Sequence, residues 1–182
     1  MRMLLLHICC AHCLAKTLNA WRAEINSSAI AGFFFNPNIH PLQEFRKRLR
    51  ALEIYLERDP LNAELEASYG LSSFCRAIHP NYLRPERCRI CYRLRLMRTA
   101  QRAAEMGCDA FTTTMVASCH QDHALLRAEG EAAANTAGVG FVYRDLRDAA
   151  VDAKLTRSLY RQQYCGCVFS EAERYAGEQA LR

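Results

Sequence analysis

Seven of the ten cysteines in this 182-residue chain stand in three short groups, and their thiols are the side chains best suited to chemistry. Buried structural cysteines usually occur singly, so this grouping indicates metal or redox chemistry. No secretory signal is readable, so we expect free thiols in a cytoplasmic protein and no disulfide framework. The grouped residues are Cys9, Cys10 and Cys13, then Cys88 and Cys91, then Cys165 and Cys167.

The first two groups could supply one site of four thiols. Cys88 and Cys91 form a Cys-x-x-Cys pair, and Cys9 and Cys10 would complete the set. Four thiolates suit tetrahedral zinc or an iron-sulfur cluster. Chelating pairs on zinc are normally separated by about two to four residues, so adjacent cysteines disfavour a simple zinc site. The spacing therefore favours a cluster over zinc.

The pair Cys165 and Cys167 raises a separate question. A disulfide between them would close a small strained ring, and strained, exposed disulfides are the reducible, catalytic kind. Alternatively, the pair could hold a second metal ion beside the first site. An ordinary turn is the third alternative, and Gly166 between the thiols makes it the weakest. The remaining cysteines occur singly, and we expect them only to pack: Cys75, Cys108 and Cys119.

Arginine dominates the positive charge of the chain. There are 24 Lys and Arg against 19 Asp and Glu, a net charge of +5, and all but three of the cations are arginine. Eight arginines lie between Arg76 and Arg102, where Glu86 is the single acid. Guanidinium pairs bidentately with phosphate and stacks on bases, so clustered arginine is typical of an RNA-facing surface. The alternative is the solvated face of a basic helix.

Strands and helices are expected to alternate along the chain and so to position these groups. Apolar and helix-forming segments predict strands at 3–8, 30–35, 110–115 and 141–143, and helices at 15–26, 42–56, 91–106, 121–137, 151–160 and 171–180. Residues 61–85 predict a short helix and an irregular excursion. This order is typical of an α/β fold with a parallel sheet and helices on both faces. We expect one domain over 1–182 and no membrane span, because the apolar run at 3–8 is too short.

Several motifs follow predicted strands, and open α/β sheets bind ligands at the carboxyl ends of their strands. Cys9 follows the first strand, and a loop with Asn36, Asn38 and His40 follows the second. The amides and the imidazole of this loop could face a substrate, although Asn-Pro is also an ordinary turn former. The basic residues at 46–50 could track phosphates together with the arginine-rich stretch.

Five blocks of sequence resemble the QueH family of cobalamin-independent epoxyqueuosine reductases. In the family's order and over nearly the whole chain, they are LLHICC, FNPNIHP, PERCRICYRLRL, FTTT and YRQQYCGCVFS. The resemblance implies a Rossmann-like fold related to the PP-loop and adenine-nucleotide hydrolase group. It also implies the last step of queuosine synthesis, in which the epoxide oxygen of epoxyqueuosine at the tRNA wobble position is removed. The expected substrates are the queuosine tRNAs for aspartate, asparagine, histidine and tyrosine, and the electron donor is unknown.

The resemblance also implies cofactors and ligands. It places a 4Fe-4S cluster on Cys9, Cys10, Cys88 and Cys91, with a mononuclear iron close by, and a redox-active or second-metal pair on Cys165 and Cys167. Family members usually have Pro where this chain has His12, so His12 and Cys13 become further candidates for the second metal. The expected tRNA or substrate contacts are Asn36, Asn38, His40, Arg87, Arg89 and Arg93.

Two other functions could use the same residues. A zinc-stabilised tRNA-binding module would need the cysteines and the arginines, but it would be colourless and contain no iron or sulfide. A thiol-disulfide oxidoreductase would centre on one of the two spaced cysteine pairs, but it would not explain the adjacent Cys9 and Cys10.

Overall fold

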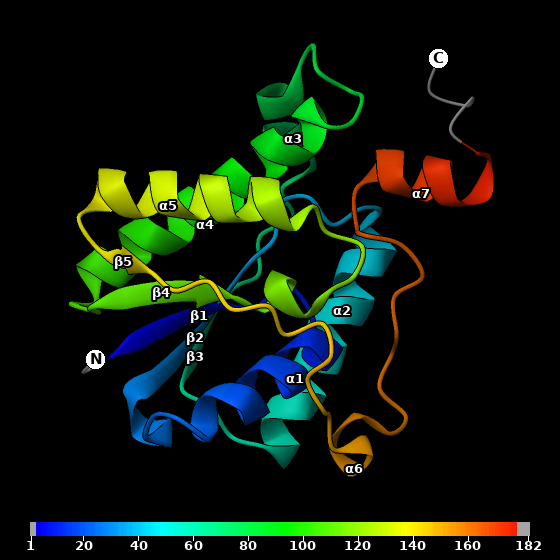
Figure 1. Cartoon of the computed structure of the whole chain (residues 1–182). Helices are drawn as coiled ribbons and strands as arrows, with labels where there is room; N and C mark the ends of the chain where they lie inside the picture. Colours follow the sequence, from blue (N-terminus) through cyan, green and yellow to red (C-terminus); the bar gives the residue numbers. More distant parts are fainter. Residues whose placement is uncertain (1–2, 178–182) are drawn as a thin grey trace.

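The computed structural model describes residues 3–177, and at its centre lies a sheet of five parallel strands (Figure 1). The strands are β1 Leu4–His7, β2 Ile30–Phe35, β3 Ala63–Glu66, β4 Ala110–Thr113 and β5 Gly140–Phe141. Their order is β3-β2-β1-β4-β5, so the chain builds outward from β1 in one direction and then in the other. The switch point of the sheet therefore lies between β1 and β4.

Helices cover both faces of the sheet. In Figure 1, one helical layer lies below the sheet and α4 and α5 lie above it. The lower layer comprises α1 Ala11–Arg22, α2 Leu42–Arg58 and α6 Ala153–Thr156. The upper layer comprises α4 Glu86–Glu105 and α5 His123–Ala137, and α3 Leu71–Ile78 packs on α4. The remaining elements are α7 Val168–Tyr175 and two short 3-10 helices, η1 Ser27–Ala29 and η2 Thr114–Ala117. The predicted α/β class, with a parallel sheet between two helical layers, is confirmed.

The central strand divides its leucines between the two layers. Leu4 and Leu6 pack into the core below the sheet with Leu52 of α2, whereas Leu5 packs into the core above it with Leu96 of α4. All five side chains are fully buried. Since each buried leucine contributes about 1.5–3 kcal/mol, the apolar contacts on both faces fix the position of β1 and of the residues that follow it.

The first helix begins earlier than the sequence pattern predicts. α1 starts at Ala11 and not at residue 15, because Cys10 acts as its N-cap and the Cys10 sulfur accepts a hydrogen bond from the Cys13 amide. α4 likewise starts at Glu86, ahead of the predicted start at residue 91, so Cys88 and Cys91 both lie in the helix. These shifts place cysteines at helix N-termini, where the helix dipole favours thiolates.

Other boundaries differ at the edges of the fold. β3 lies within residues 61–85, for which the sequence predicts a short helix and an irregular excursion. The pattern misses this half-exposed edge strand because the strand carries no apolar run. The predicted helix at 151–160 is reduced to α6, and beyond it Ser158 adopts a positive φ of 64°. α7 replaces the predicted helix at 171–180, of which residues 178–180 lie outside the described part of the chain. Within residues 3–177, the helices are all too short or too polar to cross a bilayer.

Candidate active site

Three strand ends meet at one buried histidine. His7, the last residue of β1, is fully buried, and its ring nitrogens lie 2.8 Å from Thr113 Oγ1 and 3.1 Å from the Phe35 carbonyl oxygen. Burial lowers the pKa of His7 well below its usual value, so the ring is neutral. His7 therefore joins the carboxyl ends of β1, β2 and β4 beside the switch point, where open α/β sheets bind ligands.

Three thiols converge just beyond His7. The sulfur atoms of Cys9, Cys10 and Cys13 lie within 4.8 Å of one another. The Cys9 amide donates a hydrogen bond of 2.9 Å to the Thr114 hydroxyl oxygen, and the same hydroxyl donates to the Cys9 sulfur over 3.1 Å. Because the chain turns directly from β1 into α1, it gathers three thiols that could hold a metal.

Hydrogen bonds give these thiols different proton affinities. Bonds from the side chains of Cys13 and Cys9 hold the pKa of Cys10 well below its usual value. Conversely, the bond to Cys10 raises the pKa of Cys9 to about 12 and raises the pKa of Cys13 well above its usual value. The side-chain amide of Gln162 also donates to the Cys10 sulfur, over 3.0 Å. Cys10 is therefore the favoured thiolate of the three.

The site contains two cavities, and the other four grouped cysteines line the smaller one, of about 120 Å³. Cys88 and Cys91 come from the start of α4, and Cys165 and Cys167 come from the turn that leads into α7. Burial raises the pKa of Cys91 to about 12 and also raises the pKa values of Cys88 and Cys167. The structure thus brings the two spaced cysteine pairs together, although 73 residues lie between Cys91 and Cys165 in the sequence.

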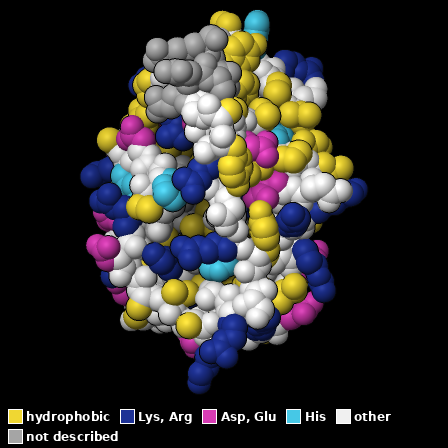
Figure 2. All heavy atoms as spheres, turned by 90° about the vertical axis from the view of Figure 1, so that its right-hand side faces the viewer, with side chains coloured by type: hydrophobic (Ala, Val, Ile, Leu, Met, Phe, Trp, Pro, Cys, Tyr) yellow, Lys and Arg dark blue, Asp and Glu magenta, His cyan; other side chains and the backbone are white. Residues whose placement is uncertain are grey.

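A larger cavity of about 230 Å³ adjoins the smaller one (Figure 2). Cys9 and Cys13 lie in its wall. The two cavities share Cys165 and three polar neighbours, Asn38, His120 and Gln121. The side-chain nitrogen of Gln121 lies 3.5 Å from the Cys165 sulfur. Cys165 therefore stands where both cavities meet.

A buried ion pair of α2 fixes the turn that carries Cys165. Arg48 pairs with Glu44 at 2.6 Å, and its guanidinium also donates to the carbonyl oxygens of Tyr164 and Cys165, each over 2.9 Å. This position corrects the prediction that the basic residues at 46–50 track phosphates as a group, because Arg48 points into the protein. Gly166 closes the turn with a φ of 148°, where a side chain would be strained.

Most arginines of the predicted RNA-facing stretch are paired with acids. Arg87 is 1% exposed, pairs with Glu173 of α7 at 2.6 Å and lies 5.4 Å from the centre of the Phe169 ring. Arg87 thus holds α7 on α4 from a buried position in the wall of the smaller cavity, and its contact with tRNA or substrate stays a prediction. The other pairs are Arg84 with Glu173, Arg89 with Glu86, Arg93 with Glu129, Arg98 with Glu66, and Arg102 with Glu64.

Two positively charged residues of the larger cavity differ from the arginines of α4 because they are not paired with acids within residues 3–177. The described lining residues of this cavity include Lys16 and Arg161 at the rim and no acidic side chain. Neither of these two cations has a carboxylate within 4.0 Å in the described part of the chain, and the Lys16 ammonium donates to a backbone carbonyl. Figure 2 shows Lys and Arg side chains near the hollow on this face. Unpaired charge at a cavity rim attracts anions more strongly than paired charge does.

Arg95 is a buried cation in the wall of the larger cavity. It is 3% exposed, and its guanidinium donates to the Asn36 side-chain oxygen over 2.7 Å. Among residues 3–177 it pairs with no carboxylate, and its Nε has no hydrogen-bond acceptor. Buried charges are normally paired, so Arg95 faces a place that an anionic group would suit.

The predicted substrate loop is only partly turned toward the cavities. Asn38 lines both of them, and its side-chain oxygen has no partner in the described structure. Asn36 instead bonds to the Ile8 carbonyl and to Arg95. His40 is buried, its Nε2 lies 3.0 Å from the Pro37 carbonyl oxygen, and burial lowers its pKa to about 4. Substrate contact thus stays a prediction that suits Asn38 better than its two neighbours.

Spacing in the sequence did not identify several residues that shape the site. His7, Arg48, Thr114, Gln121 and Gln162 act through partners that are mostly distant in the sequence, so spacing could not identify them. His12, predicted as a possible ligand, lines the larger cavity with an unpartnered Nδ1. The two glutamines have neighbours in the sequence that could have drawn attention to them. Gln162 lies three residues before Cys165, and Gln121 directly follows His120.

Comparison with known proteins adds independent evidence. The family model described as epoxyqueuosine reductase QueH matches residues 4–173. A protein named epoxyqueuosine reductase QueH from Dehalococcoides mccartyi is 39% identical over 175 residues, which cover 94% of each chain. The protein of that name from Thermotoga maritima is 33% identical over 93% of this chain and 91% of its own length. The Helicobacter pylori relative of that name is 35% identical, but this chain covers 49% of it.

Proposed function

The chain belongs to the QueH family of epoxyqueuosine reductases, and on that basis we propose that it reduces epoxyqueuosine in tRNA to queuosine, the last step of queuosine synthesis. The observation that best supports this function is the position of Cys165, on the wall shared by a thiol-lined cavity and a cavity with a cationic rim. The proposed substrates are the tRNAs for aspartate, asparagine, histidine and tyrosine. Because the proposed substrate is tRNA, we also propose that the enzyme is cytoplasmic.

The chemistry of the site fits a metal cofactor. Three thiols converge within 4.8 Å, and the buried charge of Arg95 suits an anionic group. We propose a 4Fe-4S cluster held by Cys9, Cys10, Cys88 and Cys91, with Cys165 and Cys167 beside it either as a dithiol or as ligands of a mononuclear iron. When bound, the cluster would supply electrons one at a time.

The reaction converts an epoxide into an alkene and water, which takes two electrons and two protons. Cys165 and Cys167 could supply all four as a dithiol: both carbon-oxygen bonds break, a sulfur-sulfur bond forms and water leaves. If the pair instead holds iron, no disulfide forms and the electrons come from the external donor. In both cases Cys165 lies where the substrate would meet the thiol-lined cavity.

We place the anticodon loop over the larger cavity. A wobble base in a single-stranded loop can be turned out of its stack into a protein cavity. Lys16 and Arg161 at the rim would contact the phosphates beside this nucleotide, and Asn38 would face the inserted group. Because such contacts release counterions, tRNA binding should weaken steeply as salt is raised.

Replacing Cys165 with serine tests this function. The full chain is purified without oxygen, its iron and sulfide are measured, and conversion of epoxyqueuosine in tRNA is followed by mass spectrometry of the nucleosides. We expect Cys165→Ser to abolish conversion and Cys75→Ser to retain it, because Cys75 belongs to none of the three groups and lines neither cavity. Conversion by Cys165→Ser would contradict both roles considered for the pair.

The same preparations separate the two roles and the rival functions. If Cys165 is a metal ligand, the variant loses iron beyond the four atoms of the cluster. If it is half of a dithiol, the iron content is unchanged, and the wild-type protein forms one disulfide per single turnover without a reductant. A protein with zinc but no sulfide would instead be an RNA-binding module, and turnover without iron would indicate a thiol-disulfide enzyme.

A further inference from the structure

Arg95 holds a position that no ion pair of the protein explains. It lies one helical turn after Cys91 on α4, a spacing that puts the two side chains on the same face of the helix. It also lines the larger cavity together with Cys9, Cys13 and Cys165. Thus one buried guanidinium faces thiols that come from three separate segments of the chain.

The groups packed around Arg95 do not neutralise it. Asn36 accepts one hydrogen bond from it and in turn donates to the Ile8 carbonyl, so the guanidinium is held by neutral groups. His7 contacts the Thr113 hydroxyl and the Phe35 carbonyl oxygen and offers Arg95 no negative charge. An isolated buried cation is strongly unfavourable because it has lost its hydration, so an anionic group is needed to offset that cost.

We propose that Arg95 is the counter-charge of the sulfur-ligated metal site and thereby raises its reduction potential. Thiolate-ligated clusters carry negative charge, and reduction by one electron adds one further negative charge. A fixed positive charge in a poorly hydrated site stabilises the reduced form more than the oxidised form, so the potential rises. The inference rests on the proposed cofactor and makes Arg95 a positioning residue that acts through the metal site.

The test measures the midpoint potential of the full chain after reconstitution with iron and sulfide. Arg95→Met removes the charge and keeps a long apolar stem, whereas Arg95→Lys keeps the charge. Arg98→Met is the matched control, because Arg98 lies one turn further along α4 and is paired with Glu66 and Glu105. All variants are compared by optical titration under anaerobic conditions.

We expect Arg95→Met to lower the reduced-to-oxidised ratio about tenfold at the wild-type midpoint, a shift of about 59 mV for a one-electron couple. Arg95→Lys should restore most of the potential, and Arg98→Met should leave it unchanged. An unaltered potential in Arg95→Met, or an equal shift in Arg98→Met, would overturn the inference even if the wild-type enzyme reduces epoxyqueuosine.

Loss of the metal in one variant is also informative. If Arg95→Met takes up no iron, Arg95→Gln, which can keep a hydrogen bond to Asn36, replaces it in the titration. If neither neutral variant takes up iron but Arg95→Lys does, the charge is needed to assemble the site, which supports the inference. If Arg95→Lys fails as well, charge is not the deciding property and the inference is wrong. A wild-type chain that binds no iron would overturn the proposed cofactor together with it.

Discussion

Two regions of the molecule carry positive charge and differ in whether that charge is paired with acids. On α4, most arginines face carboxylates, as Arg87 faces Glu173 and Arg102 faces Glu64. Around the larger cavity, Lys16 and Arg161 have no acidic partner in the described part of the chain. A cation that is already paired has little charge left for RNA, whereas an unpaired cation at a rim can bind phosphate. Local charge density in sequence therefore did not separate paired from unpaired cations, and pairing favours the rim of the larger cavity as the RNA-facing surface.

The largest expected effect is a loss of stability when a paired arginine of α4 is replaced. Arg87→Met should lower the free energy of unfolding by about 2 kcal/mol, because it removes a buried charged hydrogen bond and leaves Glu173 with only the half-exposed Arg84 as a partner among the described residues. Urea denaturation of protein with matched iron content measures this change.

The double variant Arg87→Met/Glu173→Gln provides the control. Removing both charges should recover part of the lost stability, since no carboxylate then lacks its buried partner and Arg84 is open to solvent. A single variant as stable as the wild type, combined with strongly weakened tRNA binding, would show that Arg87 belongs to the RNA-binding group after all.

The fold class could be predicted because its signals are local. Leu4, Leu5 and Leu6 form a continuous apolar run, which is how a strand buried on both faces appears in sequence. The three cysteine groups were also recognisable from spacing. The pairing of arginines could not be predicted, because Arg87 and Arg93 meet acids that lie 86 and 36 residues further along the chain. Burial of Arg48 in the basic run at 46–50 depends in the same way on a distant turn, the one that carries Cys165.

A smaller effect is expected at the unpaired rim. Lys16→Gln and Arg161→Gln should each weaken binding of epoxyqueuosine tRNA several-fold at low salt. Each should also reduce the slope of log affinity against log salt by about 0.7, the value for one phosphate contact on a single strand. Binding measured over a range of salt concentrations gives both numbers.

Stability separates this prediction from a folding defect. Both rim side chains lie at the surface of the cavity without an acidic partner in the described residues, so the unfolding free energy should change by less than about 0.5 kcal/mol. Unchanged salt slopes in both variants would mean that the phosphates lie elsewhere on the protein.

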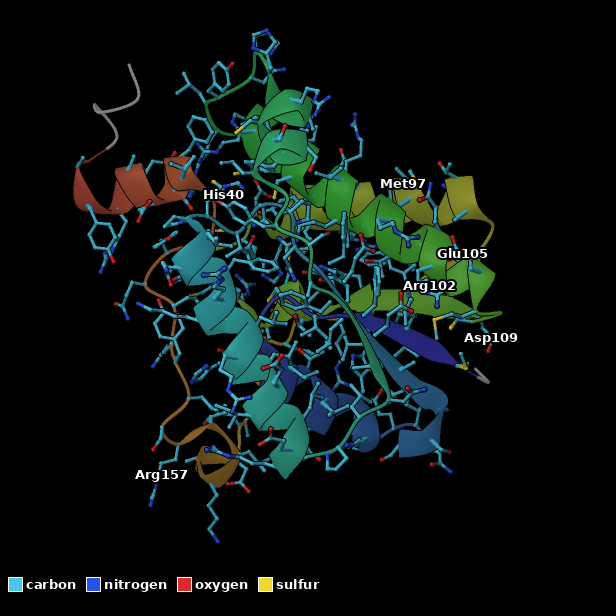
Figure 3. All side chains as sticks on the ribbon, turned by 180° about the vertical axis from the view of Figure 1, so that it is seen from behind. His40, Met97, Arg102, Glu105, Asp109 and Arg157 are labelled. Atoms are coloured by element: carbon cyan, nitrogen blue, oxygen red, sulfur yellow. The ribbon has the colours of Figure 1, made fainter. Side chains whose placement is uncertain are left out.

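The smallest effect is expected for a paired arginine far from the cavities. Figure 3 shows Arg102 and Glu105 toward one end of α4 and His40 near the other. Arg102 contacts Glu64 at 2.6 Å and Glu105 at 3.0 Å and is 30% exposed, so solvent weakens both pairs. Arg102→Gln should therefore lower the unfolding free energy much less than Arg87→Met does, and it should leave the salt slope of tRNA binding unchanged. A decrease in slope equal to that of Lys16→Gln would contradict the division between paired and unpaired arginines, because it would mean that an ion-paired guanidinium still binds phosphate.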